Sequence, residues 1–314
     1  MNKAASTKSF RETLSLYLIN KIREMKVGYQ NYLMILPYIS FFILFTVLPV
    51  LIALILGLTD FNMIQFPSFV GWQNYIRMIL EDDIFITAMK NTFIFAIVTG
   101  PTSYIVCFIL AWMINDFSPK IRAVITMIFY APALTGQAFI VWIYIFSPDQ
   151  YGILNGILIR TGIIKEAIGW LTDPKYILGV VILVQLWMSL GTGFLAFIAG
   201  LQGVDRSLYE SGYIDGVRNR FQELWYITLP SMIPQMIFSA VMQIVVSFSS
   251  AEVSMRLAGF PSTEYAAETI VTHIIDYGTI RYEMGYASAM ASVLFVFMLA
   301  ANKAVNRLLK NVGS

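Results

Sequence analysis

The chain has almost none of the side chains that form disulfides, bind metals or transfer protons. Its 314 residues include one cysteine, Cys107, and one histidine, His273. A disulfide needs two cysteines, and a zinc site or a general base needs partner side chains at a defined spacing. The composition therefore excludes a disulfide framework and a cysteine-based metal site. We expect both residues to serve as packing side chains.

Charged residues are also scarce, at 13% of the chain, whereas hydrophobic residues make up 58%. A soluble core does not need that much apolar surface. Crossing a hydrocarbon layer of roughly 30 Å takes about 20 apolar residues. The sequence predicts an all-α integral membrane protein with six transmembrane helices, an even number that leaves both termini on one side. These spans lie at 33–58, 89–114, 122–146, 176–199, 231–249 and 285–302.

The predicted spans carry their few charges only at their ends, and no charge occurs between Leu33 and Thr59. An ion-coupled carrier needs a buried acid or base for its proton or cation, and an intramembrane enzyme needs catalytic groups. The sequence also lacks a phosphate loop of the G-x-x-x-x-G-K type. We therefore expect no cofactor on this chain, and any energy for transport to come from another subunit.

Proline and glycine interrupt several of the apolar spans. Such residues are tolerated in a membrane where neighbouring helices or a cavity satisfy the freed backbone groups. They favour a bundle that bends, although each is also an ordinary component of membrane helices. The positions are Pro37, Pro49, Gly100, Pro101, Pro132, Gly136, Gly191 and Gly193.

Lysine and arginine are unevenly distributed between the segments that join the spans. The segments 1–32, 115–122, 200–230 and 303–314 hold 14 of the 21 basic residues but only 7 of the 19 acidic ones. Basic residues accumulate in cytoplasmic loops, so both termini are predicted to be cytoplasmic in a plasma membrane. Because the net charge of +2 is divided across the bilayer, nucleic acid is not an expected partner.

The chain thus divides into a cytoplasmic N-terminal segment at 1–32, a transmembrane domain at 33–302 and a cytoplasmic tail at 303–314. The first segment is too polar for a signal peptide. Its apolar residues recur every three or four positions, which is typical of a helix lying along the inner membrane surface. An irregular basic tail is the alternative. The apolar positions are Phe10, Leu14, Leu18, Ile22 and Met25.

A polar, helix-prone segment at 204–230 separates the fourth predicted span from the fifth. Asp205 or Ser207 can cap a short helix, and Pro230 can end the segment. Its apolar side chains are of the kind that fill a groove on a partner, although a helix that only covers the bundle end is the alternative. They are Leu208, Tyr209, Tyr213, Phe221, Leu224 and Trp225.

This segment resembles the E-A-A…D-G-A…I-T-L-P loop of the permeases of binding-protein-dependent ABC importers. The matching residues are Glu210, Asp215-Gly216 and Ile227-Thr228-Leu229-Pro230. Ser211 and Gly212 stand where the family favours alanines, and the spacing from Gly216 to Ile227 is one residue longer than usual.

The resemblance implies the type I ABC importer permease fold, with a cytoplasmic coupling helix between the fourth and fifth spans. In that family the helix contacts an ATP-hydrolysing subunit, which uses ATP and magnesium and moves the permease between inward- and outward-facing states. The residues implied for this contact are Glu210, Gly212, Asp215, Gly216, Leu229 and Pro230.

Further segments resemble the carbohydrate branch of that family, of which the maltose permeases are members. They are Phe69-Val70-Gly71-Trp72-Gln73-Asn74-Tyr75, Asn91-Thr92-Phe93, Tyr151-Gly152-Ile153-Leu154-Asn155 and Gly285-Tyr286-Ala287-Ser288-Ala289. Gly259-Phe260-Pro261 departs from the Gly-Gly-Pro of many sugar permeases, which leaves the sugar open. The implied partners are a second homologous permease, two ATP-binding subunits, an extracytoplasmic solute-binding protein, the sugar and membrane lipid.

Sugar hydroxyls that leave water need aromatic faces, amides or hydroxyl groups as new partners. Candidates for the substrate path are Gln185, Trp187, Gln243 and Ser247, together with Ser189 and Thr192. Polar side chains also hold membrane helices together, so packing is the alternative for each.

The sequence thus predicts the permease subunit of an ATP-driven importer for a sugar or oligosaccharide, in a bacterial or archaeal plasma membrane. One alternative is a permease of the same fold for a glycerol phosphodiester or a polyamine. A membrane enzyme or scaffold without a transport role is the alternative from a different class.

Overall fold

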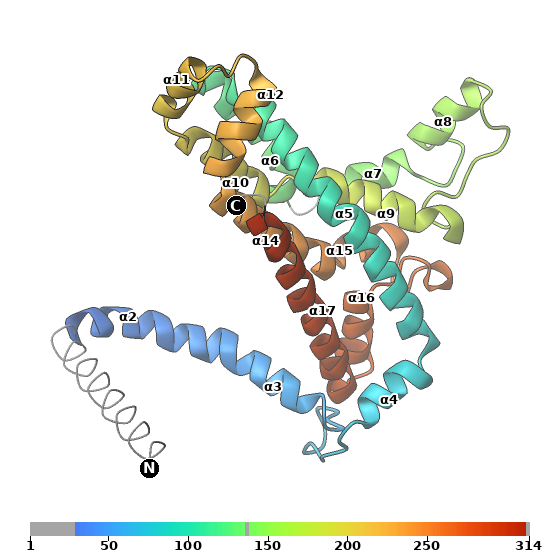
Figure 1. Cartoon of the computed structure of the whole chain (residues 1–314). Helices are drawn as coiled ribbons and strands as arrows, with labels where there is room; N and C mark the ends of the chain where they lie inside the picture. The colour runs from blue at the N-terminus through green and yellow to red at the C-terminus, as the bar shows by residue number, and fades with distance from the viewer. Residues whose placement is uncertain (1–28, 136–137, 312–314) are drawn as a thin grey trace, which may run out of the picture. The chain divides into compact units, whose positions relative to one another are not determined.

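The computed structural model describes residues 29–135 and 138–311, and Figure 1 shows their course. Over these residues the regular structure is helical, apart from one isolated bridge between Thr59 and Phe69. The all-α prediction is confirmed. The predicted surface helix at 10–25 lies outside the described residues. The chain forms two units that divide between Ile55 and Leu56, and each is described by itself.

The first unit contains one long apolar helical run. It begins with α2 (Tyr29–Phe42), continues through the π-helical segment η1 (Ile43–Val47) and ends in α3 (Leu48–Leu56). These 28 residues are long and apolar enough to span a membrane. They correspond to the first predicted span, at 33–58.

The second unit holds the remaining helices. Its centre is α5 (Asp83–Asn115), which packs against α9 (Pro174–Met188), α10 (Thr192–Gly203) and α14 (Ile233–Ser249), while α17 (Met284–Asn311) packs on α14. The other helical elements are α4 (Gln73–Leu80), α6 (Pro119–Thr135), α7 (Ile140–Ile145), α8 (Ile153–Arg160), α11 (Arg206–Ile214), α12 (Arg220–Glu223), η2 (Leu224–Thr228), α13 (Leu229–Ser231), α15 (Glu252–Ala258), η3 (Thr263–Tyr265), α16 (Ile270–Ile275) and η4 (Asp276–Ile280).

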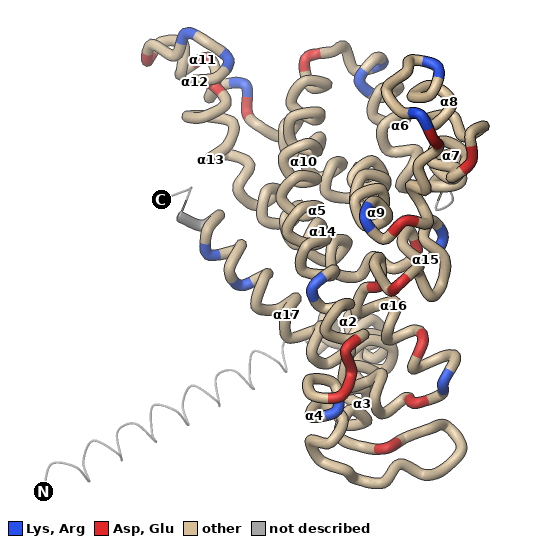
Figure 2. The backbone as a smooth tube through the Cα atoms, turned by 90° about the vertical axis from the view of Figure 1, so that its right-hand side faces the viewer, with Lys and Arg blue, Asp and Glu red and all other residues tan. Residues whose placement is uncertain are grey.

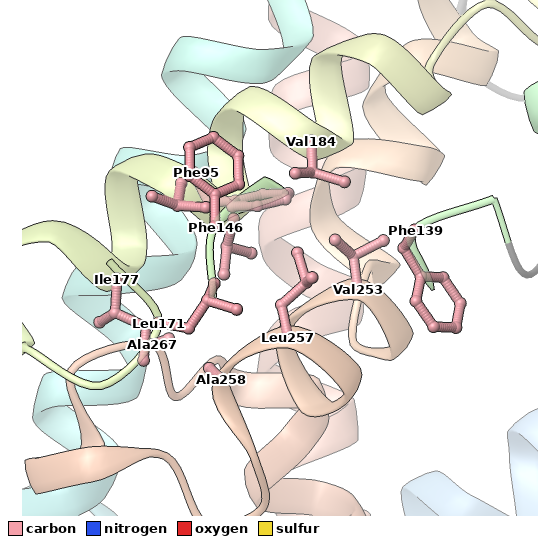
Figure 3. Packing of buried hydrophobic residues seen from close by; sticks show 12 residues of the cluster. Phe95, Phe139, Phe146, Leu171, Ile177, Val184, Val253, Leu257, Ala258 and Ala267 are labelled. Carbon is pink, nitrogen blue, oxygen red and sulfur yellow. The ribbon is translucent and has the colours of Figure 1, made fainter. Parts of the chain in front are cut away.

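Buried apolar side chains form three clusters between these helices. Figure 3 shows the first, where Phe95 of α5 and Val184 of α9 lie near Val253 and Leu257 of α15. The second surrounds Tyr286 and Met290 of α17, and the third joins α5 to α10 and α14. Cys107 belongs to the third cluster and is fully buried, which confirms its expected packing role.

Five helical runs among the described residues are long and apolar enough to cross a membrane. They are Tyr29–Leu56, Asp83–Asn115, Pro174–Gly203, Ile233–Ala258 and Met284–Leu309. The third predicted span, at 122–146, corresponds to α6 and the short α7, with a turn at Ala138 and Phe139 directly before α7. Pro132 lies inside α6, close to its C-terminal end. The apolar run therefore does not appear as one continuous helix.

The fifth and sixth predicted spans also differ from the sequence-based boundaries. The fifth, at 231–249, extends past a break into α15 and so reaches Ala258. The last helix continues to Asn311, so the predicted tail at 303–314 begins within a helix. Figure 2 shows charged residues at the end formed by α11 and α12 and at the opposite end near α4.

Asp82 connects three helices at the α4 end of the second unit. It caps α5 by accepting a hydrogen bond from the Phe85 backbone N–H at 2.9 Å. Its carboxylate also lies 2.9 Å from Nε2 of His273 in α16 and accepts the Tyr286 hydroxyl of α17 at 2.7 Å. His273 is 1% exposed and lies within a packed polar cluster, as expected for a packing side chain.

Burial of Asp82 raises its pKa, but the hydrogen bonds from His273, the Phe85 backbone and Tyr286 outweigh this effect and lower the pKa to about 2. Because the pKa of Asp82 is lower in the folded protein than in the unfolded chain, Asp82 increases the free energy of unfolding at pH values above the ordinary pKa of an aspartate. This contribution disappears as the pH falls toward 2. Asp82→Asn should therefore cost about 2 kcal/mol at neutral pH. Thermal unfolding of the purified complex from pH 7 downward would measure this.

The neighbouring exposed residue Asp83 provides the matched control. Asp83→Asn should change stability by less than about 0.5 kcal/mol, since exposed charges contribute little. Equal effects of the two substitutions at pH 7 would show that the Asp82 cluster does not hold these helix ends together.

Candidate functional site

The segment between the fourth and fifth predicted spans folds as two short helical elements joined by a tight turn. Asp205 caps α11 by accepting the Ser207 backbone N–H at 3.0 Å, and Asn219 caps α12 by accepting the Gln222 N–H at 2.9 Å. Gly216 lies between them with φ of 93°, a backbone conformation that glycine adopts without strain. A helical run then continues through η2 to Ser231, one residue past the predicted end at Pro230.

Helix α11 packs back against η2. The Tyr209 hydroxyl lies 2.9 Å from the Thr228 hydroxyl, and the Tyr213 hydroxyl donates to Glu223 at 2.6 Å. Gly212 is buried at this contact, where a Cβ atom would lie 2.6 Å from Cδ1 of Ile227. The absence of a side chain at position 212 thus allows the two helical elements to touch.

The outward face of this pair combines polar and large apolar side chains. Glu210 and Asp215 are exposed, and four of the predicted apolar anchors are exposed as well, namely Leu208, Tyr213, Phe221 and Trp225. Ile214, which was not among the predicted anchors, is 88% exposed. The other two predicted anchors, Tyr209 and Leu224, line a cavity beneath the pair. Exposed apolar groups next to charges are typical of a surface that docks a partner.

Two of the long helices are broken part-way along their length. Helix α9 ends before Ser189 and α10 begins after Gly191, while α14 ends at Ser249 and α15 begins at Glu252. A break leaves backbone carbonyls without their helical partners, and interrupted helices of this kind commonly form solute sites in transporters.

Side chains connect the two breaks. The Ser250 hydroxyl donates to Oε1 of Gln185 at 2.8 Å, and Nε2 of Gln243 donates to the Ser189 carbonyl at 3.3 Å. Gly193 permits the close approach of α10 and α14, because a Cβ atom there would lie 2.7 Å from Oγ of Ser239. The polar groups at both breaks are therefore held on neighbouring helices.

A cavity of about 330 Å³ lies beside the two breaks. Its polar lining comes from six side chains, namely Tyr130, Gln185, Ser189, Thr192, Gln243 and Glu252. The set offers amides, hydroxyls and one carboxylate, which together can donate to and accept from a solute rich in hydroxyl groups.

The structure thus brings Gln185 and Gln243 together, with Ser189 and Thr192 beside them, but places two other predicted residues elsewhere. Trp187 packs edge-to-face on Trp142, with ring centroids 5.5 Å apart. Ser247 lines a neighbouring, largely apolar cavity that Gln243 also lines.

Two lining residues, Tyr130 and Glu252, were not among the residues predicted from the sequence. Tyr130 lies on the divided third span. Glu252 was assigned to an outer loop because the fifth span was expected to end at residue 249. The short distance in sequence from residue 249 to Glu252 was the only feature that could have indicated a place in the site.

No family model matches the chain. The chain is 30% identical over 274 residues to the probable ABC transporter permease protein YesP of Bacillus subtilis (strain 168), which covers 85% of this chain and 86% of the relative. It is 34% identical over 216 residues to the lactose transport system permease protein LacF of Rhizobium radiobacter, covering 67% of this chain and 70% of the relative.

A chain of the bacterial alginate ABC transporter, solved with an alginate-pentasaccharide-bound periplasmic protein, has a similar fold. The TM-score is 0.73 at 23% identity, with 93% of this chain and 98% of that chain covered. At this identity the likeness concerns the fold alone. The relatives, in contrast, share sequence along most of their length. The chain therefore belongs to the family of ABC transporter permease proteins.

Proposed function

We propose that the chain forms half of the translocation path of an ATP-driven importer for an uncharged sugar or oligosaccharide. The observation that supports this most directly is the polar cavity where the broken helices α9–α10 and α14–α15 meet. Its amides and hydroxyl groups suit a solute with many hydroxyl groups. The name of the lactose permease relative agrees with a sugar.

The charge of the cavity limits the class of solute. Glu252 is its one charged lining residue within the described part of the chain, and no lysine or arginine lines it. A carboxylate next to an anionic solute is unfavourable, because like charges repel most where little water screens them. A glycerol phosphodiester is therefore disfavoured. A polyamine is the second candidate, since Glu252 could pair with one of its amines.

The proposed assembly contains a second homologous permease, two ATP-binding subunits and an external solute-binding protein. In it, the exposed face of α11 and α12 contacts an ATP-binding subunit, and ATP with magnesium is bound by that subunit only. Of the residues predicted for this contact, Glu210, Asp215 and Gly216 are exposed and would touch the subunit, Gly212 is buried and would hold α11 against η2, and Leu229 and Pro230 lie in α13 behind the pair. The chain crosses the plasma membrane six times, counting α6 and α7 together as one crossing, and both termini are cytoplasmic.

Transport in proteoliposomes tests the function. The reconstituted complex with its binding protein should import neutral oligosaccharides and hydrolyse ATP faster in their presence, but should not respond to glycerol phosphodiesters. A response to spermidine alone would favour the polyamine importer. The absence of uptake for every solute that the binding protein binds would contradict an importer.

Cysteine labelling tests the proposed orientation. Thr172 and Ser207 are both exposed and lie in segments between spans, on opposite sides of the membrane in the six-span arrangement. In a Cys107→Ser background, Thr172→Cys should react with an impermeant thiol reagent in intact cells, whereas Ser207→Cys should react only after permeabilisation. Labelling of position 207 in intact cells would contradict this arrangement.

A further inference from the structure

A second polar cavity, of about 380 Å³, lies beneath α11 and α12 and differs in charge from the one beside the helix breaks. Three arginines line it, against two acids. The arginines are Arg122, Arg206 and Arg220, and the acids are Asp116 and Glu223. Figure 2 shows basic and acidic residues at this end of the molecule.

The two acids are already engaged by other groups. Asp116 forms an ion pair with Arg220, whose guanidinium also lies 5.8 Å from the ring centre of Trp112. Glu223 accepts the Tyr213 hydroxyl. The acids therefore have limited capacity left for the remaining two arginines.

Arg122 and Arg206 have no carboxylate partner among the ion pairs of the described residues. Within residues 29–135 and 138–311, Arg122 donates to two neutral oxygens, the backbone carbonyl and the side-chain amide of Asn115, at 3.3 and 3.4 Å. These are long contacts for a charged donor. The cavity thus carries an excess of positive charge with guanidinium donors available.

The cavity lies at the ends of helices that are long and apolar enough to cross a membrane. Asn115 is the last residue of the α5 span, and Arg122 lies in the first turn of α6. Leu201 and Trp112 give the lining an apolar side next to the arginines. Phospholipid phosphates occupy this boundary, and tryptophan is enriched there.

We propose that this cavity binds the phosphate of an anionic phospholipid headgroup. The planar guanidinium groups match the oxygens of a phosphate, and basic pockets between membrane helices are suited to such headgroups. Arg206 and Tyr209 belong to α11, Arg220 to α12, and Arg122 to α6. A bound headgroup would therefore link the α11–α12 pair to the transmembrane helices, and lipid composition would influence how firmly the pair is held.

The test measures lipid bound to the purified complex. The complex in neutral detergent is titrated with phosphatidylglycerol, phosphatidylcholine or inorganic phosphate, and bound molecules are counted by native mass spectrometry. Wild type should retain phosphatidylglycerol in preference to phosphatidylcholine. The double variant Arg122→Gln/Arg206→Gln should bind phosphatidylglycerol roughly 30-fold more weakly, since each basic residue near a charged membrane surface contributes on the order of one kcal/mol.

The double variant Lys303→Gln/Arg307→Gln is the matched control. It removes the same charge from exposed positions on α17, and should bind phosphatidylglycerol as wild type does. Equal weakening in both double variants would overturn the site. Displacement of the lipid by inorganic phosphate at equal concentration would assign the cavity to a free anion and overturn the lipid. Loss of the ATP-binding subunits from the Arg122→Gln/Arg206→Gln complex with phosphatidylglycerol binding unchanged would also overturn it, by assigning the arginines to subunit docking.

Discussion

Replacing Gly212 by leucine is expected to abolish uptake and binding-protein-stimulated ATP hydrolysis, while the chain still inserts into the membrane. The added side chain would begin 2.6 Å from Cδ1 of Ile227 and so force α11 away from η2. The outward face of the pair would then no longer match a partner surface. Uptake and ATPase rates of the purified complex, with expression measured alongside, provide the test.

Gly203→Leu is the control, because nothing lies within 4 Å of a Cβ atom at Gly203. It should retain near wild-type rates. Glu210→Lys separates docking from folding, since Glu210 is exposed and its replacement leaves the helix contact intact. A reversed charge at a docking face costs several kcal/mol, so the ATP-binding subunits should associate roughly 100-fold more weakly. Wild-type uptake in both Gly212→Leu and Glu210→Lys would place the coupling surface elsewhere.

Gln243→Leu is expected to reduce uptake at least about tenfold with little loss of stability. The substitution removes one donor to the Ser189 carbonyl, which still accepts the Gly191 backbone N–H at 2.8 Å, and it removes an amide from the proposed solute site. Leaving a buried solute hydroxyl unpaired costs roughly 1–3 kcal/mol, whereas an interhelical hydrogen bond in a membrane contributes only about 0.6 kcal/mol to stability. Uptake and thermal unfolding of the same preparation separate the two roles.

Gln235→Leu, two turns away on the same helix, is the matched control. Its buried Oε1 atom has no hydrogen-bond partner among the described residues, so its loss should affect neither uptake nor folding. Trp187→Ala should lower stability and uptake together, because Trp187 packs on Trp142. A selective loss of uptake in Trp187→Ala, with Gln243→Leu unaffected, would move the substrate path to the aromatic side of α9.

The helical class and the apolar spans could be predicted because a membrane imposes length and composition on each segment. The effect of each proline and glycine on its helix could not be predicted. Pro101 lies inside the continuous helix α5, and Pro37 lies inside α2, whereas the Gly191 region interrupts the fourth span. Whether a helix bends or breaks depends on which neighbouring groups satisfy the freed backbone, and these neighbours are distant in the sequence.

The candidate site shows the same limit. Gln185 and Gln243 could be predicted because amide side chains are easily recognised within apolar spans, and both residues line one cavity. Glu252 could not be predicted, because the hydropathy pattern places the end of the fifth span before the break that leads into α15. Trp187 was selected for its chemistry, but which way a helix faces its neighbours is decided by packing that the sequence of one helix does not show.

The carboxylate of Asp82 fastens the ends of α5, α16 and α17 at a single point, whereas the breaks near Ser189 and Ser250 act as joints further along the bundle. The helices joined at Asp82 are α5, α16 and α17, whereas the breaks lie in the α9–α10 and α14–α15 runs, so the joined helices form a frame against which the broken runs can bend. Opening of this bundle would therefore be a bending of the two broken runs relative to that frame. Small rotations at the break near Ser189 would produce larger displacements at α11. The opening of the cavity beside the two breaks would change more than the volume of the cavity.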